Sequence, residues 1–304
     1  MSKSVVTSKP STVKQLSNTG AGKTPLGSLK IGFNGMSPSE WAAHSKNVWN
    51  DLSSPRDKRQ LEHGAVFPVK LAERLIKIYS KEDDYVLDPF LGIGTTVVAA
   101  QNTGRHAVGI ELNPRFVKMA EEWQKANTSL LGKKVRCKIV NDDCRNLLDH
   151  VKSGSLQLTV TSPPYANFIR RSVSDRQTTH KKSIIALANK STVKPYSDDV
   201  RDLGNLAYRQ FMDDVEEILR LNCNATKRGG YSVWVVKDYR DTVNKIPYIA
   251  VHSDLAAAGE RAGYKFHDLI VWDQTGQRRL VLLGYPSVFY SNQNCSFIVV
   301  FRKC

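Results

Sequence analysis

Strand-like and helix-like segments alternate along most of the 304-residue chain, and this alternation restricts the fold more than any other feature. Short apolar runs such as 85–90 and 156–162 have the composition of buried strands, while 67–80 and 208–226 carry apolar residues at helical spacing. Such alternation is typical of a parallel sheet with helices on both faces. We therefore predict an α/β protein with a doubly wound, mostly parallel sheet and a single main domain.

The same reading gives the boundaries of the expected elements. Ser37 or Ser39 can cap the expected helix over 37–49, and Pro68 suits the first turn of the expected helix over 67–80. The expected helices are 37–49, 67–80, 91–104, 114–126, 208–226 and 249–263, and the expected strands are 85–90, 106–112, 135–143, 156–162, 229–238, 264–273 and 296–303.

The first 34 residues differ in composition from the rest of the chain. Residues 1–34 are rich in Ser, Thr, Gly and Lys and contain no acidic residue. A segment so poor in apolar residues is expected to be a flexible basic arm. The expected helices and strands all follow this segment, so we assign residues 35–304 to the main domain.

The net charge indicates the kind of partner. A formal charge of +15 favours a polyanion, either nucleic acid or an anionic membrane. No apolar run reaches the roughly 18 residues of a membrane span, and the N-terminus lacks the apolar core of a signal peptide. A cytoplasmic protein without a membrane partner is therefore expected. The five cysteines form no CxxC pair, so neither a disulfide framework nor a metal site is expected.

A glycine turn follows the first buried strand. In "DPFLGIGTT", Asp88 ends the strand, and Gly92 and Gly94 allow a sharp turn and a close approach of a ligand to the backbone. In open α/β sheets, ligands bind at this carboxyl edge of the strands. The turn therefore marks a candidate binding site.

Carboxylates at the next two strand ends suggest the ligand. Glu111 is placed to accept hydrogen bonds from ribose hydroxyls, and Asp142 or Asp143 could accept one from an adenine amino group. Val97 stands where a dinucleotide motif has its third glycine, which favours a smaller adenosyl ligand such as S-adenosylmethionine. The alternative is that these acids only cap helices in an ordinary α/β protein.

A proline pair follows the fourth strand. In "TSPPYANF" the prolines remove two backbone donors and leave carbonyls that can only accept. Ser162 adds a side-chain oxygen, and Tyr165 adds a flat ring. Acceptors beside a ring suit the amino group of an extruded planar base. The alternative is a rigid turn without chemistry.

Together these motifs resemble the S-adenosylmethionine-dependent amino-methyltransferases of DNA. The family's cofactor loop reads like "DPFLGIGTT", and its catalytic loop, D/S/N-P-P-Y/F, is matched by "SPPY" at Ser162–Tyr165. In this family the Ser form is associated mainly with cytosine-N4 and the Asp form mainly with adenine-N6. The resemblance covers residues 61–303 and implies a Rossmann-like methyltransferase fold.

The resemblance implies two sets of site residues and no metal. The catalytic set is Ser162, Pro163, Pro164 and Tyr165. The cofactor set is Phe67, Pro68, Asp88, Pro89, Phe90, Gly92, Gly94, Thr95, Thr96, Glu111, Asp142 and Asp143.

The sequence departs from the family pattern in three respects. Ile93 stands between the glycines where a small residue is usual, and the cofactor half precedes the catalytic half, an order that many members reverse. No separate target-recognition domain is expected after the last strand. Reading of the DNA site is therefore expected from 168–194, from the loop around 275–293 or from the N-terminal arm.

The segment after the catalytic loop is strongly basic. Residues 168–194 carry seven cations against the single acid Asp175, and we expect a loop over 168–200 that contacts DNA and becomes ordered on it. The alternative is a surface insertion without function. The expected DNA contacts are Arg170, Arg171, Arg176, Lys181 and Lys182.

The expected activity is direct methyl transfer from S-adenosylmethionine to the N4 amino group of a flipped cytosine in double-stranded DNA, without a covalent intermediate. The family implies two candidate partners besides DNA, a cognate restriction endonuclease and a second copy of the chain. Three alternatives stay open: adenine-N6 methylation of DNA, amino-methylation of RNA, and a non-catalytic nucleic-acid-binding module. Asp238 is expected to form a solvated pair with Lys237, with a place in the pocket as the alternative.

Overall fold

The structure is a computed structural model that describes residues 30–52, 66–128, 135–164, 197–241, 244–277, 280, 282–283 and 286–304. In this part of the chain, eight strands form one sheet in the order β1-β9-β10-β6-β5-β2-β3-β4. The strands of the sheet are β1 (Val48–Trp49), β2 (Tyr85–Asp88), β3 (His106–Glu111), β4 (Cys137–Asn141), β5 (Leu156–Thr161), β6 (Thr226–Val236), β9 (Lys265–Asp273) and β10 (Cys295–Arg302). Only β10 runs antiparallel to its neighbours, so the prediction of a mostly parallel sheet is confirmed.

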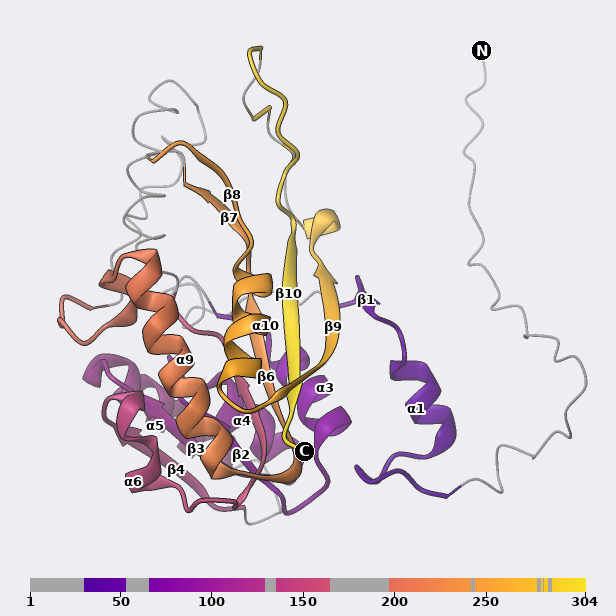
Figure 1. The fold of residues 1–304 in the computed structure, drawn as a ribbon. Helices are drawn as coiled ribbons and strands as arrows, with labels where there is room; N and C mark the ends of the chain where they lie inside the picture. Colours follow the sequence, from indigo (N-terminus) through magenta and orange to yellow (C-terminus); the bar gives the residue numbers. More distant parts are fainter. Residues whose placement is uncertain are drawn as a thin grey trace, which may run out of the picture.

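Helices cover both faces of this sheet. The α-helices of the described part of the chain are α1 (Pro38–His44), α3 (Val69–Tyr79), α4 (Thr95–Asn102), α5 (Pro114–Thr128), α6 (Leu147–His150), α9 (Tyr208–Ala225) and α10 (Val251–Arg261), of which α1 buries no residue. Short 3-10 helices lie at Cys144–Asn146, Leu203–Asn205 and Thr275–Gln277, and β7 (Tyr239–Asp241) pairs with β8 (Ile246–Ile249) in a separate hairpin. In Figure 1, α9 and α10 lie on one side of the sheet, and α3 and α4 lie on the other.

The alternation of side chains along the strands builds two cores. Val233 and Val235 of β6 pack with α3, α4 and α5, whereas Trp234 and Val236 pack with α6, α9 and α10. Successive strand residues point to opposite faces, so an unbroken apolar run is what a strand covered on both faces requires. The doubly wound arrangement predicted from the sequence is thereby confirmed.

The region of α1 differs from its prediction. The expected helix over 37–49 ends at His44, and Val48 and Trp49 form a strand that pairs with Val271 and Trp272 of β9. Ser37 caps the helix through a capping box with Glu40, as expected of a serine at this place. Beyond His44, pairing with the free edge of β9 overrides local helix preference. The β7–β8 hairpin was also not predicted, because it arises within the run between β6 and α10.

The last residues assigned to the basic arm are part of the folded body. The Asn34 side chain donates a hydrogen bond to the Ile78 carbonyl over 2.7 Å, and the Phe33 ring stacks on Tyr231 with centroids 5.8 Å apart. Phe33 and Asn34 therefore contact β6 and α3, and the division of the chain at residue 34 stays a prediction. No helix in the described part of the chain is long and apolar enough to cross a membrane.

Candidate active site

The glycine turn is built from contacts on both sides of β2. The Leu91 amide donates to the Ile110 carbonyl of β3 over 2.9 Å, which ties the turn to the neighbouring strand. Gly92 and Gly94 have φ values of 56° and 98°, which strain any residue with a Cβ. A Cβ on Gly94 would lie 3.0 Å from that of Ala120. Gly94 therefore serves the packing of α4 on α5, and its predicted role in the approach of a ligand stays a prediction.

Asp88 joins the glycine turn to the strand that leads to the proline pair. Its Oδ1 accepts from the Thr161 hydroxyl over 2.6 Å and from the Phe90 amide over 3.0 Å, while its Oδ2 accepts from the Thr96 hydroxyl over 2.6 Å. The side chain is buried, and burial raises the pKa of Asp88 to about 6 despite these donors. Asp88 thus fixes the relative position of the two motifs.

Glu111 lies at the end of β3 with both oxygens engaged by backbone. Its Oε2 accepts from the Gly92 amide over 2.8 Å, and its Oε1 accepts from the Asn113 amide over 2.8 Å. Each carboxylate oxygen has a further lone pair, so Glu111 can still accept from a ligand hydroxyl. Burial raises the pKa of Glu111 to about 7, against the opposing effect of the two amides.

A cavity at the carboxyl edge of the sheet brings most of the predicted residues together. It encloses about 890 Å³, counting the space at its open mouth. Both the glycine turn and the proline pair contribute to its wall. The predicted residues that line it are Phe67, Asp88, Pro89, Phe90, Gly92, Thr95, Glu111, Asp143, Ser162, Pro163 and Pro164.

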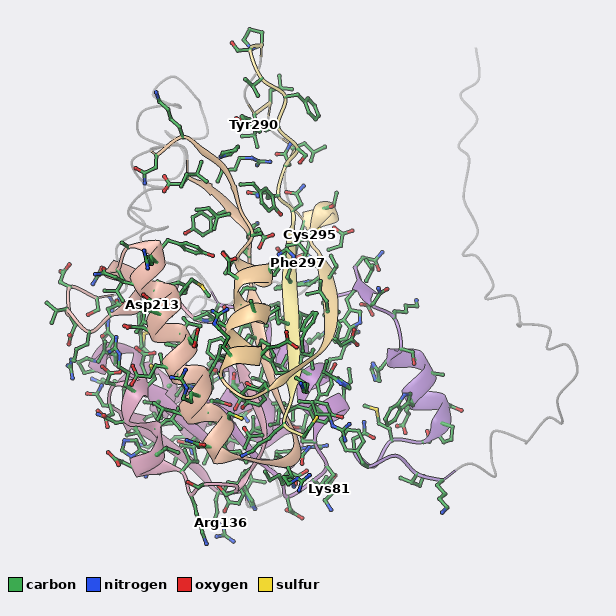
Figure 2. All side chains as sticks on the ribbon, viewed as in Figure 1. Lys81, Arg136, Asp213, Tyr290, Cys295 and Phe297 are labelled. Carbon is green, nitrogen blue, oxygen red and sulfur yellow. The ribbon has the colours of Figure 1, made fainter. Side chains whose placement is uncertain are left out.

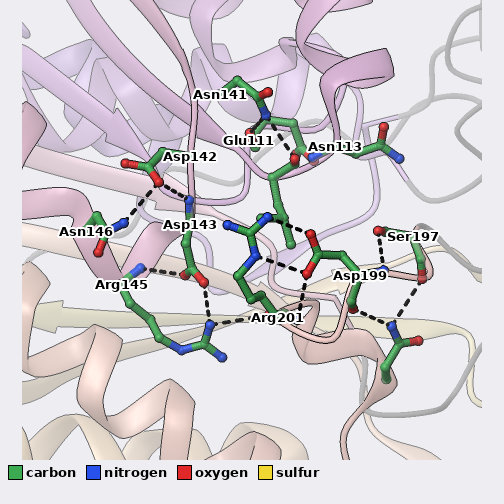
Figure 3. Close-up of polar contacts among 12 residues, drawn as sticks. Glu111, Asn113, Asn141, Asp142, Asp143, Arg145, Asn146, Ser197, Asp199 and Arg201 are labelled. Atoms are coloured by element: carbon green, nitrogen blue, oxygen red, sulfur yellow. Dashed lines mark hydrogen bonds and ion pairs between the residues drawn. The ribbon is translucent and has the colours of Figure 1, made fainter.

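Four predicted cofactor residues do not line this cavity. Pro68 is the N-cap of α3, Thr96 is used by Asp88, and Gly94 faces α5. Asp142 accepts from His150 Nε2 over 2.7 Å and from Asn146 Nδ2 over 3.0 Å, as Figure 3 shows for Asn146. The hydrogen bond from His150 lowers the pKa of Asp142. Of the two adjacent acids, Asp143 lines the cavity and Asp142 does not.

The predicted DNA contacts and the catalytic ring cannot be placed. Tyr165, Arg170, Arg171, Arg176, Lys181 and Lys182 lie outside the described residues.

One wall of the cavity was not predicted. It comes from residues 197–203, of which Arg201 pairs with Asp199 over 2.6 Å. Figure 3 shows Arg145, from the 3-10 helix Cys144–Asn146, reaching both Asp143 and this wall. Arg145 Nη1 donates to Asp143 over 2.6 Å and to the Arg201 carbonyl over 3.3 Å, and its Nη2 pairs with Asp214 of α9 over 2.6 Å. No pattern in the sequence connects these distant segments.

Further lining residues are mostly apolar and were also missed. They come from positions next to predicted ones and from the first turn of α5, where nothing in residue type separates a ligand contact from ordinary core packing. These residues are Val66, Leu91, Leu112, Asn113, Phe116 and Cys144.

Thr95 carries a buried hydroxyl that has no hydrogen-bond partner within the described residues. It is the first residue of α4, and the N-cap of that helix, Gly94, offers no side-chain cap. The first amides of a helix lack intrahelical partners and carry a partial positive charge. The cavity therefore has a place for an anionic group of a ligand at this end.

Asp238 is buried, so the prediction of a solvated pair with Lys237 is wrong. Only 2% of Asp238 is exposed, and its Oδ2 accepts from the Tyr248 hydroxyl and from His252 Nδ1, each over 2.7 Å. The His252 ring stacks on Phe297, the β10 residue labelled in Figure 2, with centroids 4.2 Å apart. The β7–β8 hairpin and α10 cover the end of β6, and nothing in the sequence indicates that they bury Asp238. Asp238 does not line the cavity.

The raised pKa of Glu111 predicts opposite pH dependences for ligand affinity and for stability. A protonated Glu111 loses acceptor capacity, so affinity for an adenosyl ligand should rise with pH up to about 7 and then level off. Below that pKa the competent fraction falls about tenfold per pH unit, and affinity falls with it. The folded-state pKa lies above the ordinary glutamate value of 4.5, so the folded state binds more protons, and the free energy of unfolding should fall as pH rises from 4.5 to about 7.

Calorimetric titration with S-adenosylmethionine across this range, together with urea unfolding, measures both dependences. Glu111→Gln should remove most of each, whereas Asp142→Asn, which alters a carboxylate outside the cavity, should keep both. Affinity that is flat with pH in the unaltered protein would contradict a carboxylate role for Glu111.

With this geometry described, the chain can be compared with known proteins. Residues 3–122 match the model of the N6/N4 DNA methylase family, described as DNA methylase. The chain is 37% identical over 97 residues to the type II methyltransferase M.BglI of Bacillus subtilis, covering 32% of this chain and 27% of the relative. It is 39% identical over 101 residues to the type II methyltransferase M.MthZI of Methanothermobacter thermautotrophicus, covering 32% and 28%. The matches thus span less than a third of the length of these relatives.

Two solved structures are similar to this chain at low identity. A TehB-like SAM-dependent methyltransferase from Corynebacterium glutamicum is 13% identical, covers 81% of this chain and 92% of its own, and has a TM-score of 0.42. A SAM-dependent methyltransferase from Methanosarcina mazei is 13% identical, covers 75% and 96%, and has a TM-score of 0.45. These likenesses concern the fold alone. The segment that matches the N6/N4 DNA methylase model, residues 3–122, includes the glycine turn and Glu111.

Proposed function

We propose that this protein is an S-adenosylmethionine-dependent DNA amino-methyltransferase that acts on the exocyclic N4 of a flipped cytosine. The observation that supports this most is the shared cavity: Ser162 and the proline pair line the same space as Gly92 and Glu111. A cofactor motif and a base-binding motif that face one cavity provide for transfer between two bound molecules. The match of residues 3–122 to DNA methylases supports the substrate class.

The residues of the cavity fit an adenosyl cofactor. Glu111 would accept from the ribose hydroxyls, and Asp143, held by Arg145, would accept from the adenine amino group. The unpartnered Thr95 hydroxyl and the first amides of α4 would bind the carboxylate of the methionine end. Each of these groups can thus form a hydrogen bond with one polar group of the cofactor.

In the proposed reaction the bound cofactor supplies a methyl group on a sulfonium. The Ser162 oxygen and the Pro163 carbonyl would accept hydrogen bonds from the target amino group, which localises its lone pair for attack. Pro163 and Pro164 have no amide hydrogen, so no backbone donor at these two positions competes for that lone pair. Apolar and aromatic lining residues such as Phe67 and Phe90 help to keep water out of the site.

The choice of cytosine-N4 over adenine-N6 rests on Ser162, where adenine enzymes mainly have aspartate. The test is nucleoside mass spectrometry on DNA and RNA treated with the purified protein and methyl-labelled S-adenosylmethionine. We expect label in N4-methylcytosine from DNA. Label in N6-methyladenine would move the assignment to the other base, and label in RNA alone would change the substrate. Nucleic-acid binding without cofactor binding would favour a non-catalytic module.

The basic segment 168–194 is the proposed contact with DNA. It would bind phosphates, so affinity for duplex DNA should fall steeply with salt. A variant with Arg170→Ala and Arg171→Ala should bind all duplexes more weakly and show a shallower salt dependence if these side chains contact phosphate. An unchanged salt slope would exclude that role. A restriction endonuclease and a second copy of the chain stay candidate partners.

A further inference from the structure

The segment between β9 and β10 projects from the edge of the sheet that carries the proline pair. β9 ends at Asp273 and β10 begins at Cys295, and Figure 1 shows the connection extending well beyond the sheet, beside β7 and β8. β6 lies between β10 and β5, with Thr161 paired to Trp234. The β10 side of the projection's base is therefore two strand spacings, about 10 Å, from the strand that leads to Ser162.

The outer part of the projection exposes large apolar side chains. Leu282 and Phe289 are 84% and 91% exposed, and Leu280 and Val288 are 70% and 51% exposed. The sequence from 274 to 294 contains two arginines and no carboxylate. Apolar side chains so exposed in one place mark an interaction site, and the lack of acids suits a polyanionic partner.

The described parts of the projection are tied to each other and to the neighbouring hairpin. The Tyr290 amide donates to the Leu283 carbonyl over 3.3 Å, joining its two sides. The Arg240 guanidinium, from β7, lies 4.9 Å from the centre of the Tyr290 ring, which Figure 2 labels near the end of the projection. Phe289 is thus next in sequence to a residue, Tyr290, that contacts both Leu283 and Arg240.

We infer that this projection is a wedge that inserts Phe289 and Leu282 into the base stack of duplex DNA. The inference rests on the proposed function and adds to it. A flipped base leaves a gap in the stack, and apolar side chains are the groups that proteins insert between bases. The projection rises from the same edge of the sheet as the proline pair, exposes such apolar side chains, and belongs to a chain with a net charge of +15. DNA fits each observation, because it would bring the target base to that edge, offer a base stack to apolar side chains and carry the opposite charge.

The experiment compares binding to a fully paired duplex with binding to the same duplex carrying one mismatch, measured by fluorescence anisotropy. Insertion must unstack paired bases, so the unaltered protein should bind the mismatched duplex about tenfold more tightly. The double variant Phe289→Ala, Leu282→Ala should lose this preference and keep its affinity for S-adenosylmethionine. The matched control is Ile31→Ala, which removes an apolar side chain of 65% exposure from another part of the surface and should keep the preference.

Binding is measured without methyl transfer, so this result is separate from the proposed reaction. If the unaltered protein shows the mismatch preference but transfers no methyl group, the reaction fails and the wedge stands. A double variant that keeps the full preference overturns the wedge. A double variant that instead converts a dimer into a monomer in sedimentation assigns the surface to contact between two copies, which also overturns it.

Discussion

Ser162→Ala should lower the rate of methyl transfer by about a hundredfold, the effect typical of removing one group that stabilises a transition state. Ser162 lines the same cavity as the proposed cofactor contacts, and it precedes the proline pair in the chain. Its hydrogen bond would act on the target amino group as that nitrogen becomes tetrahedral. Cofactor affinity should therefore stay near that of the unaltered protein, while single-turnover transfer becomes slow.

Rapid-quench measurement of transfer, together with calorimetric titration of the cofactor, separates the two effects. Ser197→Ala is a suitable control, because Ser197 lines the same cavity but its hydroxyl accepts from the Asp199 amide over 2.9 Å. That variant should affect the rate much less. If Ser162→Ala transfers methyl groups at the original rate, the proline pair is only a turn. If it loses cofactor binding as well, Ser162 acts through the shape of the cavity.

Gly94→Ala should lower the free energy of unfolding by about 2–4 kcal/mol, the sum of left-handed backbone strain and overpacking. Gly94 has a φ of 98°, and an added Cβ would lie 3.1 Å from the Cα of Ala120, which is backbone and cannot rotate away. Gly154→Ala is the matched control. Gly154 has a φ of 67° and nothing within 4 Å of an added Cβ, so only the strain of about 1 kcal/mol should appear.

Urea unfolding of both variants measures the difference between strain and contact. The two variants should differ in unfolding free energy by the cost of moving α4 away from α5. Equal losses would mean that the helices separate without cost. A Gly94→Ala variant that is stable but does not bind S-adenosylmethionine would support the predicted role of this glycine in ligand approach.

The sequence indicated several features of the site because each depends on local chain properties. Glycines with positive φ, a strand that ends in a carboxylate and a pair of prolines are all visible in short stretches. Alternation of strands and helices then brings the carboxyl ends of parallel strands to one edge. This is why the sequence alone predicts one site that contains Gly92, Glu111 and Ser162.

Other features depended on partners distant in the chain. The adjacent acids Asp142 and Asp143 look alike in sequence, and they differ only because His150 engages the first and Arg145 holds the second at the cavity. Asp238 is buried because the β7–β8 hairpin and α10 fold over the end of β6.

The sequence by itself thus determined the parallel sheet, the edge that holds the site and the residues of its two central motifs, because backbone conformation and periodicity are local. Only the tertiary structure decided that residues 197–203 form a wall, that Gly94 packs against α5 and that one of two neighbouring acids faces the cavity. Those outcomes depend on side-chain contacts between segments far apart in sequence, and neither residue type nor spacing specifies such contacts.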